Sequence, residues 1–204
     1  MLNAQAEFEK REREIKEYLS HLEALELKTG LSVSLMNTMK SSALLMIYNS
    51  IESTMTNVLQ DVFDHLQVHS VEFNSLNSTM KALVLTYSKK KNPTTLVEKM
   101  KTSAIGLVVA CFDRSDIFSG NLDCKKIKET LTNVGITTAH KYNESALLTV
   151  KSERNDLAHG IKSFSDCGKN YSTKQLRGFH DKTSLILNRV IHDFENFLNS
   201  KAYE

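Results

Sequence analysis

Two side chains with complementary chemistry, Arg154 and His159, stand five positions apart near the end of a predicted helix. A histidine titrates near neutral pH and can carry protons to and from a reacting group. An arginine keeps its charge and offers a planar, two-pronged donor that suits phosphate. The plainer interpretation is that both residues cap a helix C-terminus, where the macrodipole favours cations. From these two residues alone, the capping interpretation is the better one.

The residues that follow extend the pattern. Residues 154–160 read Arg-Asn-Asp-Leu-Ala-His-Gly, and the chain through Ser172 fits the block RNxLAHGxxSFxxxGxxYT. This block resembles a signature of the HEPN superfamily, in a branch found in bacterial defence and toxin–antitoxin settings. Residues 49–52 and 119–123 resemble further segments of that branch. One departure is Cys-Gly-Lys at residues 167–169, where Val-Gly-Arg is expected.

The resemblance implies an all-α, HEPN-like helical bundle with metal-independent endoribonuclease activity. Enzymes of this family cleave RNA by attack of the ribose 2′-OH on the adjacent phosphate. His159 would then be the general acid or base, and Arg154 would stabilise the phosphorane as it forms. Asn155 would bond phosphate or orient the histidine, and Asp156 would hold the helix end or the imidazole. No metal or cofactor is implied.

Geometry constrains this pair. On an ideal helix, five residues correspond to about 7.5 Å of rise and about 140° of rotation, so the two side chains do not share a face. Gly160 predicts that the helix unwinds at His159, which would free the imidazole to turn back. A homodimer is the second solution, because two motifs meeting across a two-fold axis would form a composite site. The resemblance favours a dimer around the helix at residues 142–159.

Polar residues elsewhere could join the site. Glu52 and Asn49 lie in a predicted apolar helix and could pair with Arg154, or they could form its solvated flank; both interpretations stay open. Tyr48 is assigned to the core. Asp61, His65 and His69 recur every four residues and could ligate a metal, but a solvated helix face is the favoured interpretation.

Local basic clusters are candidates for RNA contact. Between residues 81 and 101 there are six lysines and one acid. Residues 125–128 hold three more lysines. Phosphates are drawn to such patches, although a soluble lysine-rich turn explains each patch equally well. Given the RNA hypothesis, the residues predicted to contact RNA are Lys89, Lys90, Lys91 and Lys151.

Apolar spacing predicts the helices that must position these residues. The predicted helices cover residues 4–29, 41–69, 71–88, 123–134, 142–159 and 172–200, with a short helix possible near 96–100 and a loop at 163–171. Periodicity cannot separate helix from strand at residues 105–112. Charge at position 11 or 12 interrupts the first stripe, so the first turns are expected to project into solvent. No linker interrupts the series, which predicts one domain over residues 1–204.

The amino-acid composition agrees with a single helical domain. The 204 residues are 41% hydrophobic and 25% charged, with 7 glycines and 1 proline, which excludes disordered and turn-rich all-β classes. No apolar run has membrane length, and no signal-peptide stretch opens the sequence. Three scattered cysteines predict free thiols in a reducing cytoplasm.

The function expected from the resemblance is a cytoplasmic ribonuclease that acts as a toxin or antiviral effector. Its expected partners are RNA, a second copy of the chain and an antitoxin or regulatory protein, with no membrane. Two alternatives stay open. One is a non-catalytic HEPN-like module that binds RNA, nucleotide or a partner protein. The other is a structural helical adaptor in which the motif is incidental.

Overall fold

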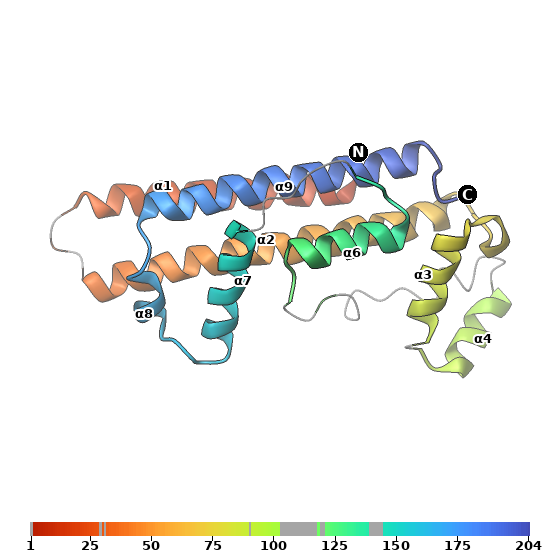
Figure 1. Ribbon diagram of the computed structural model, residues 1–204, viewed down its shortest axis with the longest axis horizontal. Coiled ribbons are helices and arrows are strands. Elements are labelled where there is room, and N and C mark those ends of the chain that lie inside the picture. The colour runs from red at the N-terminus through yellow and green to blue at the C-terminus, as the bar shows by residue number, and fades with distance from the viewer. Residues whose placement is uncertain are drawn as a thin grey trace.

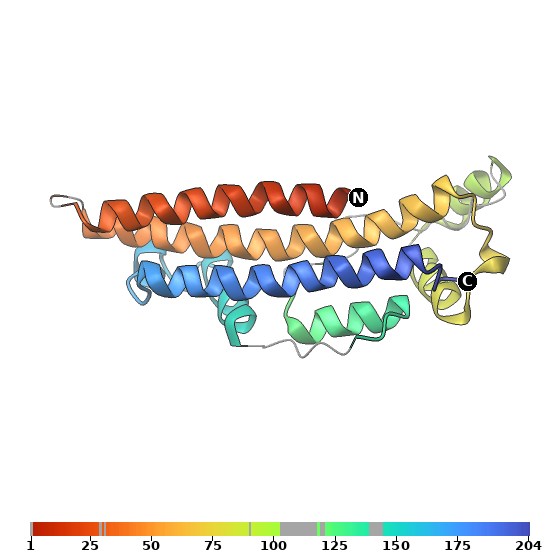
Figure 2. The ribbon, with the colours of Figure 1, turned by 90° about the horizontal axis from the view of Figure 1, so that it is seen from above.

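Three long helices lie side by side and form the frame of the molecule. In the computed structural model, α1 (Asn3–Glu26), α2 (Val33–Val68) and α9 (Thr173–Asn199) run along its length (Figures 1 and 2). The structure describes residues 2–28, 30, 32–89, 91–102, 118, 121–138 and 145–204. These ranges contain helices and no strand, so the predicted all-α class is confirmed. No helix within them combines the length and apolar character needed to cross a bilayer.

The second helix is the centre of the bundle. Buried residues cover most of the circumference of α2, and helices α1, α7, α8 and α9 all pack against it. This helix begins at Val33, eight residues before the predicted start at 41. The prediction was wrong there because residues 33–40 bury only Met36 and Lys40, so the apolar stripe is thin.

The chain that follows α2 forms short helices at one end of the bundle (Figure 1). The predicted helix at 71–88 is instead a 3-10 turn, η1 (Phe73–Ser75), followed by α3 (Ser78–Ser88). The break is due to Asn77, whose side chain accepts a hydrogen bond from the Met80 N–H at 2.9 Å and begins a new helix. Helix α4 (Pro93–Thr102) starts at the proline, where a missing N–H is tolerated. The ambiguous run at 105–112 lies outside the described residues.

The remaining helices follow their capping residues. Helix α6 (Cys124–Val134) is capped by Asp123 and ends at Gly135, which has a φ of 96°, as predicted. Helix α7 (Ser145–Ala158) ends where predicted, and its predicted first residues, 142–144, lie outside the described ranges. The capping box predicted at the start of α9 forms. The predicted loop at 163–171 contains a short helix, α8 (Phe164–Gly168), because Ser163 caps it.

Buried charges join α1 to its neighbours. The first turns of α1 are packed rather than projecting, because Glu12 finds partners inside the bundle and is only 7% exposed. Its carboxylate lies 3.0 Å from Nε2 of His180 and accepts a hydrogen bond from the Ser184 hydroxyl at 2.8 Å. The expectation that these turns project into solvent is therefore wrong.

The Asp61, His65 and His69 series also has a structural role. Asp61 is buried and accepts a hydrogen bond from the Ala4 N–H at 2.8 Å, which satisfies a free donor at the start of α1. His65 lies 3.2 Å from the Tyr203 hydroxyl and helps to hold the C-terminal turn. The solvated-face interpretation is wrong for Asp61. Over the described part of the chain, no three acidic, histidine or cysteine side chains form a metal-binding group.

We predict that Glu12→Gln destabilises the protein in a pH-dependent way. Burial raises the pKa of Glu12, but hydrogen bonds from His180 and Ser184 outweigh it and hold the pKa below its ordinary 4.5. A carboxyl whose pKa is lowered on folding stabilises the fold above its unfolded pKa and loses that contribution as pH falls. Urea unfolding should show a loss of about 1–3 kcal/mol near pH 7. The gap between variant and wild type should shrink below about pH 4.5, and a pH-independent gap would contradict this account.

Candidate functional site

Helix α7 carries the Arg154–His159 motif and ends in a defined turn. Its buried side packs through Ala146, Leu147, Val150 and Leu157. At its end, the Gly160 N–H bonds the Leu157 carbonyl and the Ile161 N–H bonds the Asp156 carbonyl. Gly160 has a φ of 67°, so the end is a Schellman motif that needs glycine. The helix therefore unwinds at His159, as the glycine predicts.

Arg154 is held against α2. Its guanidinium lies 5.0 Å from the centre of the Tyr48 ring and 4.0 Å from the Glu52 carboxylate. The neighbouring Asn155 side chain accepts a hydrogen bond from Arg154 at 3.3 Å. Arg154 is nevertheless 27% exposed, so one face of the cation stays open to solvent. Of the two α2 candidates, the structure brings Glu52 to Arg154, whereas Asn49 lines a shallow groove with Arg11 and Glu14 of α1.

Tyr48 is the residue that organises this contact, and the sequence had assigned it only to the core. Its hydroxyl donates to Glu52 at 3.3 Å and accepts from the Leu122 N–H at 3.0 Å. Burial raises the pKa of Tyr48 to about 12, so the phenol keeps its proton. The spacing of Tyr48 and Glu52, one helical turn apart on α2, was the available signal.

His159 is exposed at the end of α7. Its backbone N–H bonds the Asn155 carbonyl at 3.0 Å, and its imidazole makes no hydrogen bond to other described residues. Because Arg154 points to Tyr48, the two motif side chains are not paired within one chain. The His159 imidazole is therefore accessible, whereas the Arg154 guanidinium is held beside α2.

Two acidic residues of the motif helix hold the turn. Asp156 pairs with Lys162 at 2.8 Å, which places it at the helix end. Glu153 is 8% exposed and accepts hydrogen bonds from Lys162, Cys167 and Tyr171. The sequence analysis missed Glu153. The available signal was a carboxylate within the apolar stripe of Val150 and Leu157, where burial requires partners.

The predicted RNA-contact lysines do not gather at one place. Lys151 pairs with Asp123 at 2.8 Å and joins α7 to the start of α6. Lys89 is exposed beyond α3, at the far end of the bundle from α8 (Figure 1). Lys91 is half-buried in that turn, and Lys90 lies outside the described residues. Only Lys151 therefore stands on the motif helix.

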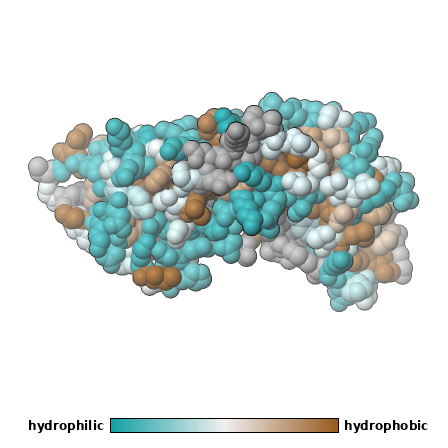
Figure 3. Space-filling model, viewed as in Figure 1, coloured by the Kyte–Doolittle hydropathy of each residue, from teal (hydrophilic) through white to brown (hydrophobic). Residues whose placement is uncertain are grey.

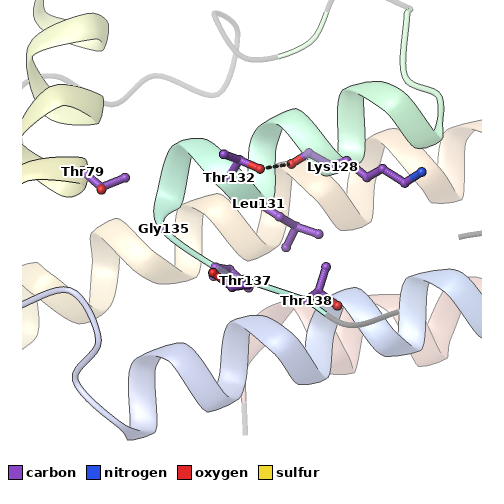
Figure 4. Close-up of a pocket in the computed structure, with 8 residues that line it drawn as sticks. Thr79, Lys128, Leu131, Thr132, Gly135, Thr137 and Thr138 are labelled. Carbon is purple, nitrogen blue, oxygen red and sulfur yellow. Dashed lines mark hydrogen bonds between the residues drawn. The ribbon is translucent and has the colours of Figure 1, made fainter. Parts of the chain in front are cut away.

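A polar depression lies beside the far end of α6. It has a volume of about 560 Å³, and its lining includes threonines from α3, from α6 and from residues 137–138 after α6 (Figure 4). Lys128 and Thr132 also line an adjoining depression that includes Lys125. The Thr132 hydroxyl donates to the Lys128 carbonyl, as Figure 4 draws. This hollow lies at one end of α6. Just before the other end, the Leu122 N–H donates to the Tyr48 hydroxyl of the site.

The fold and site define an all-helical domain that presents an arginine and a histidine at the end of a packed helix. A family model described as HEPN_MAE_28990-like HEPN matches residues 3–203, and the chain belongs to this HEPN family. HEPN domains are generally associated with ribonuclease activity. Searches of curated proteins and of solved structures gave no match.

We predict that Tyr48→Phe destabilises the protein by about 1–3 kcal/mol, because the buried Leu122 N–H loses its acceptor. Urea unfolding measures the loss, and amide exchange should quicken at Leu122. Tyr18→Phe is the matched control, since the Tyr18 hydroxyl donates to the Met39 carbonyl and is not the acceptor for a buried backbone N–H of the described residues. The control should lose less, about 0.5–1.5 kcal/mol. Equal stability of Tyr48→Phe and wild type would contradict the assigned role.

Proposed function

We propose that this protein is a metal-independent endoribonuclease of the HEPN type that acts in the cytoplasm as a toxin or antiviral effector. The observation that carries the proposal is the contrast within the motif. Arg154 is held by Tyr48 and Glu52, while the His159 imidazole is free to meet a substrate. Family membership supports the reaction class.

The proposed chemistry needs one proton carrier and one fixed cation. The ribose 2′-oxygen attacks the adjacent phosphorus and the bond from phosphorus to the 5′-oxygen breaks. The products are a 2′,3′-cyclic phosphate and a 5′-hydroxyl. His159 takes the proton from the 2′-OH or supplies one to the leaving oxygen. Arg154 stabilises the charge on the phosphorane, and its contacts with Glu52 and Asn155 orient the guanidinium.

RNA contacts would extend beyond this pair. Lys151 lies on α7, and Lys125 and Lys128 line the hollow beside α6. Lys89, Lys90 and Lys91 would contact more distant phosphates, since α3 lies towards the other end of the bundle. Ion pairing with phosphates would make the affinity for RNA fall with salt.

A homodimer would bring a histidine of one copy to an arginine of the other. Figure 3 shows a largely hydrophilic face with small apolar areas. Three exposed apolar residues on or just after α7 could pack against a second copy: Leu148, Ile161 and Phe164. An antitoxin or regulatory protein is a further partner expected for a toxin.

We predict that purified wild-type protein cleaves RNA in excess EDTA and leaves 2′,3′-cyclic phosphate ends. Arg154→Ala and His159→Ala should each lower the rate by about 100-fold or more, because each removes a group that acts in the transition state. Arg154→Lys should also be impaired, since an ammonium cannot form the two-pronged contact. Melting curves show that each variant is folded.

If wild type cleaves RNA and a folded variant does not, the activity belongs to this protein and not to a contaminating nuclease. If folded wild type cleaves no RNA but binds it, the alternative of a non-catalytic module replaces the enzyme. If both alanine variants cleave like wild type, the motif is incidental and the protein is an adaptor or uses another site.

We predict that a mixture of Arg154→Ala and His159→Ala protein regains activity if the site is shared between copies. Half of the dimers in an equimolar mixture would be mixed, and each would hold one intact site of two, giving about a quarter of the wild-type rate. Mixing His159→Ala with the double variant is the control and should stay inactive. No recovery after subunit exchange would place both groups in one chain, and a monomer by light scattering would exclude the dimer.

A further inference from the structure

One buried carboxylate gathers the segment that follows His159. Glu153 accepts hydrogen bonds from Lys162 at 3.0 and 3.1 Å, from the Cys167 thiol at 3.1 Å and from the Tyr171 hydroxyl at 2.9 Å. The three donors lie in the turn after α7, in α8 and in the turn before α9. A single side chain on α7 therefore binds the whole stretch that connects α7 to α9.

These donors keep Glu153 ionised. Burial raises the pKa of Glu153, but the hydrogen bonds from Cys167, Lys162 and Tyr171 outweigh it and lower the pKa. Burial, together with the hydrogen bond to the Glu153 carboxylate, raises the pKa of Cys167 to about 11 and that of Tyr171 to about 12. Both donors therefore keep their protons. Removing hydrogen-bond donors from a buried carboxylate costs free energy. The Glu153 contacts therefore favour one geometry of the segment between α7 and α9.

The segment is also fixed from its other side. The Ser41 hydroxyl of α2 donates to the Phe164 carbonyl at 2.6 Å. A Cβ placed on Gly168 would meet the Asn37 carbonyl oxygen at 1.8 Å, so α8 lies directly on the α2 backbone. Lys162, three residues after His159, pairs with both Glu153 and Asp156. His159 therefore lies between the fixed helix and a turn closed by Lys162.

We propose that Glu153 is a positioning residue that, through Lys162, fixes the turn bearing His159 and so the place of the imidazole relative to Arg154. This inference rests on the proposed function of the same site. Neither Glu153 nor Lys162 touches the substrate. Their effect is on the geometry of a group that must lie within a fraction of an ångström of its reacting atoms.

Kinetics of RNA cleavage test the proposal. Glu153→Gln and Lys162→Met should each lower kcat at least about tenfold with little change in KM, because a displaced catalytic group affects the chemical step more than binding. The double variant should be no worse than the poorer single one, since both remove the same contact. Lys162→Arg, which keeps the charge, should recover part of the rate. Assays run well below the melting temperature of every variant.

Lys169→Met is the matched control. Lys169 lies just after α8, in the same segment, and pairs with Asp166 at the surface, where both side chains are more than half exposed. This variant makes the same substitution and removes a lysine–carboxylate pair, but it should keep the wild-type kcat. A tenfold loss in Lys169→Met, or a wild-type kcat in Glu153→Gln and Lys162→Met, would overturn the proposal.

A second readout does not depend on activity. Side-chain NMR resolves the ring signals of the 7 histidines, and His159→Ala assigns the relevant one. The His159 signal should be single and sharp in wild type and in Lys169→Met, and broadened or split in Lys162→Met. An unchanged signal in Lys162→Met would overturn the proposal even if RNA is cleaved. A changed signal in a protein that cleaves no RNA would support the positioning contact while the proposed enzyme fails.

Discussion

The burial of α2 around most of its circumference is the constraint on which the other elements depend. A helix buried to this extent must be covered by several neighbours, and α1, α7, α8 and α9 supply that cover. A buried polar group on such a helix is stabilised by a partner inside the bundle, because water cannot reach it. Asp61 therefore caps the start of α1, and Tyr48 bonds the segment that begins α6. The same burial places Tyr48 and Glu52 against Arg154, so the position of the motif cation follows from the packing of the core.

Charged residues within apolar stripes determine how the helices meet. Glu12 of α1 binds His180 of α9, and Glu153 of α7 binds Cys167 of α8. Each carboxylate is desolvated, so sliding the helices by one turn would leave it without partners at a cost of several kcal/mol. Apolar side chains tolerate such a shift far better than a buried charge does. The apolar stripes thus stabilise the bundle, and the buried carboxylates select one register.

Local signals in the sequence predicted much of the fold. Asp123 and Gly135 bounded α6, and the capping box at Ser172 began α9, since each cap acts within a few residues. The buried carboxylates were missed because their partners are distant in the chain, as Glu12 and His180 are. Asn77 was missed because the apolar spacing continued across it. At the site, the resemblance led to Arg154 and His159 and left Glu52 as one of two open candidates, whereas Glu153 and Tyr48 required the packing of α7 on α2. Cys167, where the resemblance leads one to expect valine, donates to Glu153, which valine cannot do.

The two motif residues are restrained in different ways. Arg154 is held through its side chain by an aromatic ring and a carboxylate on another helix. His159 is held through its backbone, by the Schellman turn and by Lys162, while its ring stays in solvent. The backbone contacts position the His159 ring for proton transfer, and the side-chain contacts fix the cation in advance of the charge that it would stabilise. Arg154 faces Tyr48 and His159 is exposed at the helix end, so a phosphate between them needs either a rotation of His159 or a second chain. The rigid turn limits how far a rotation of His159 can reach, and the proposed homodimer would supply the second solution.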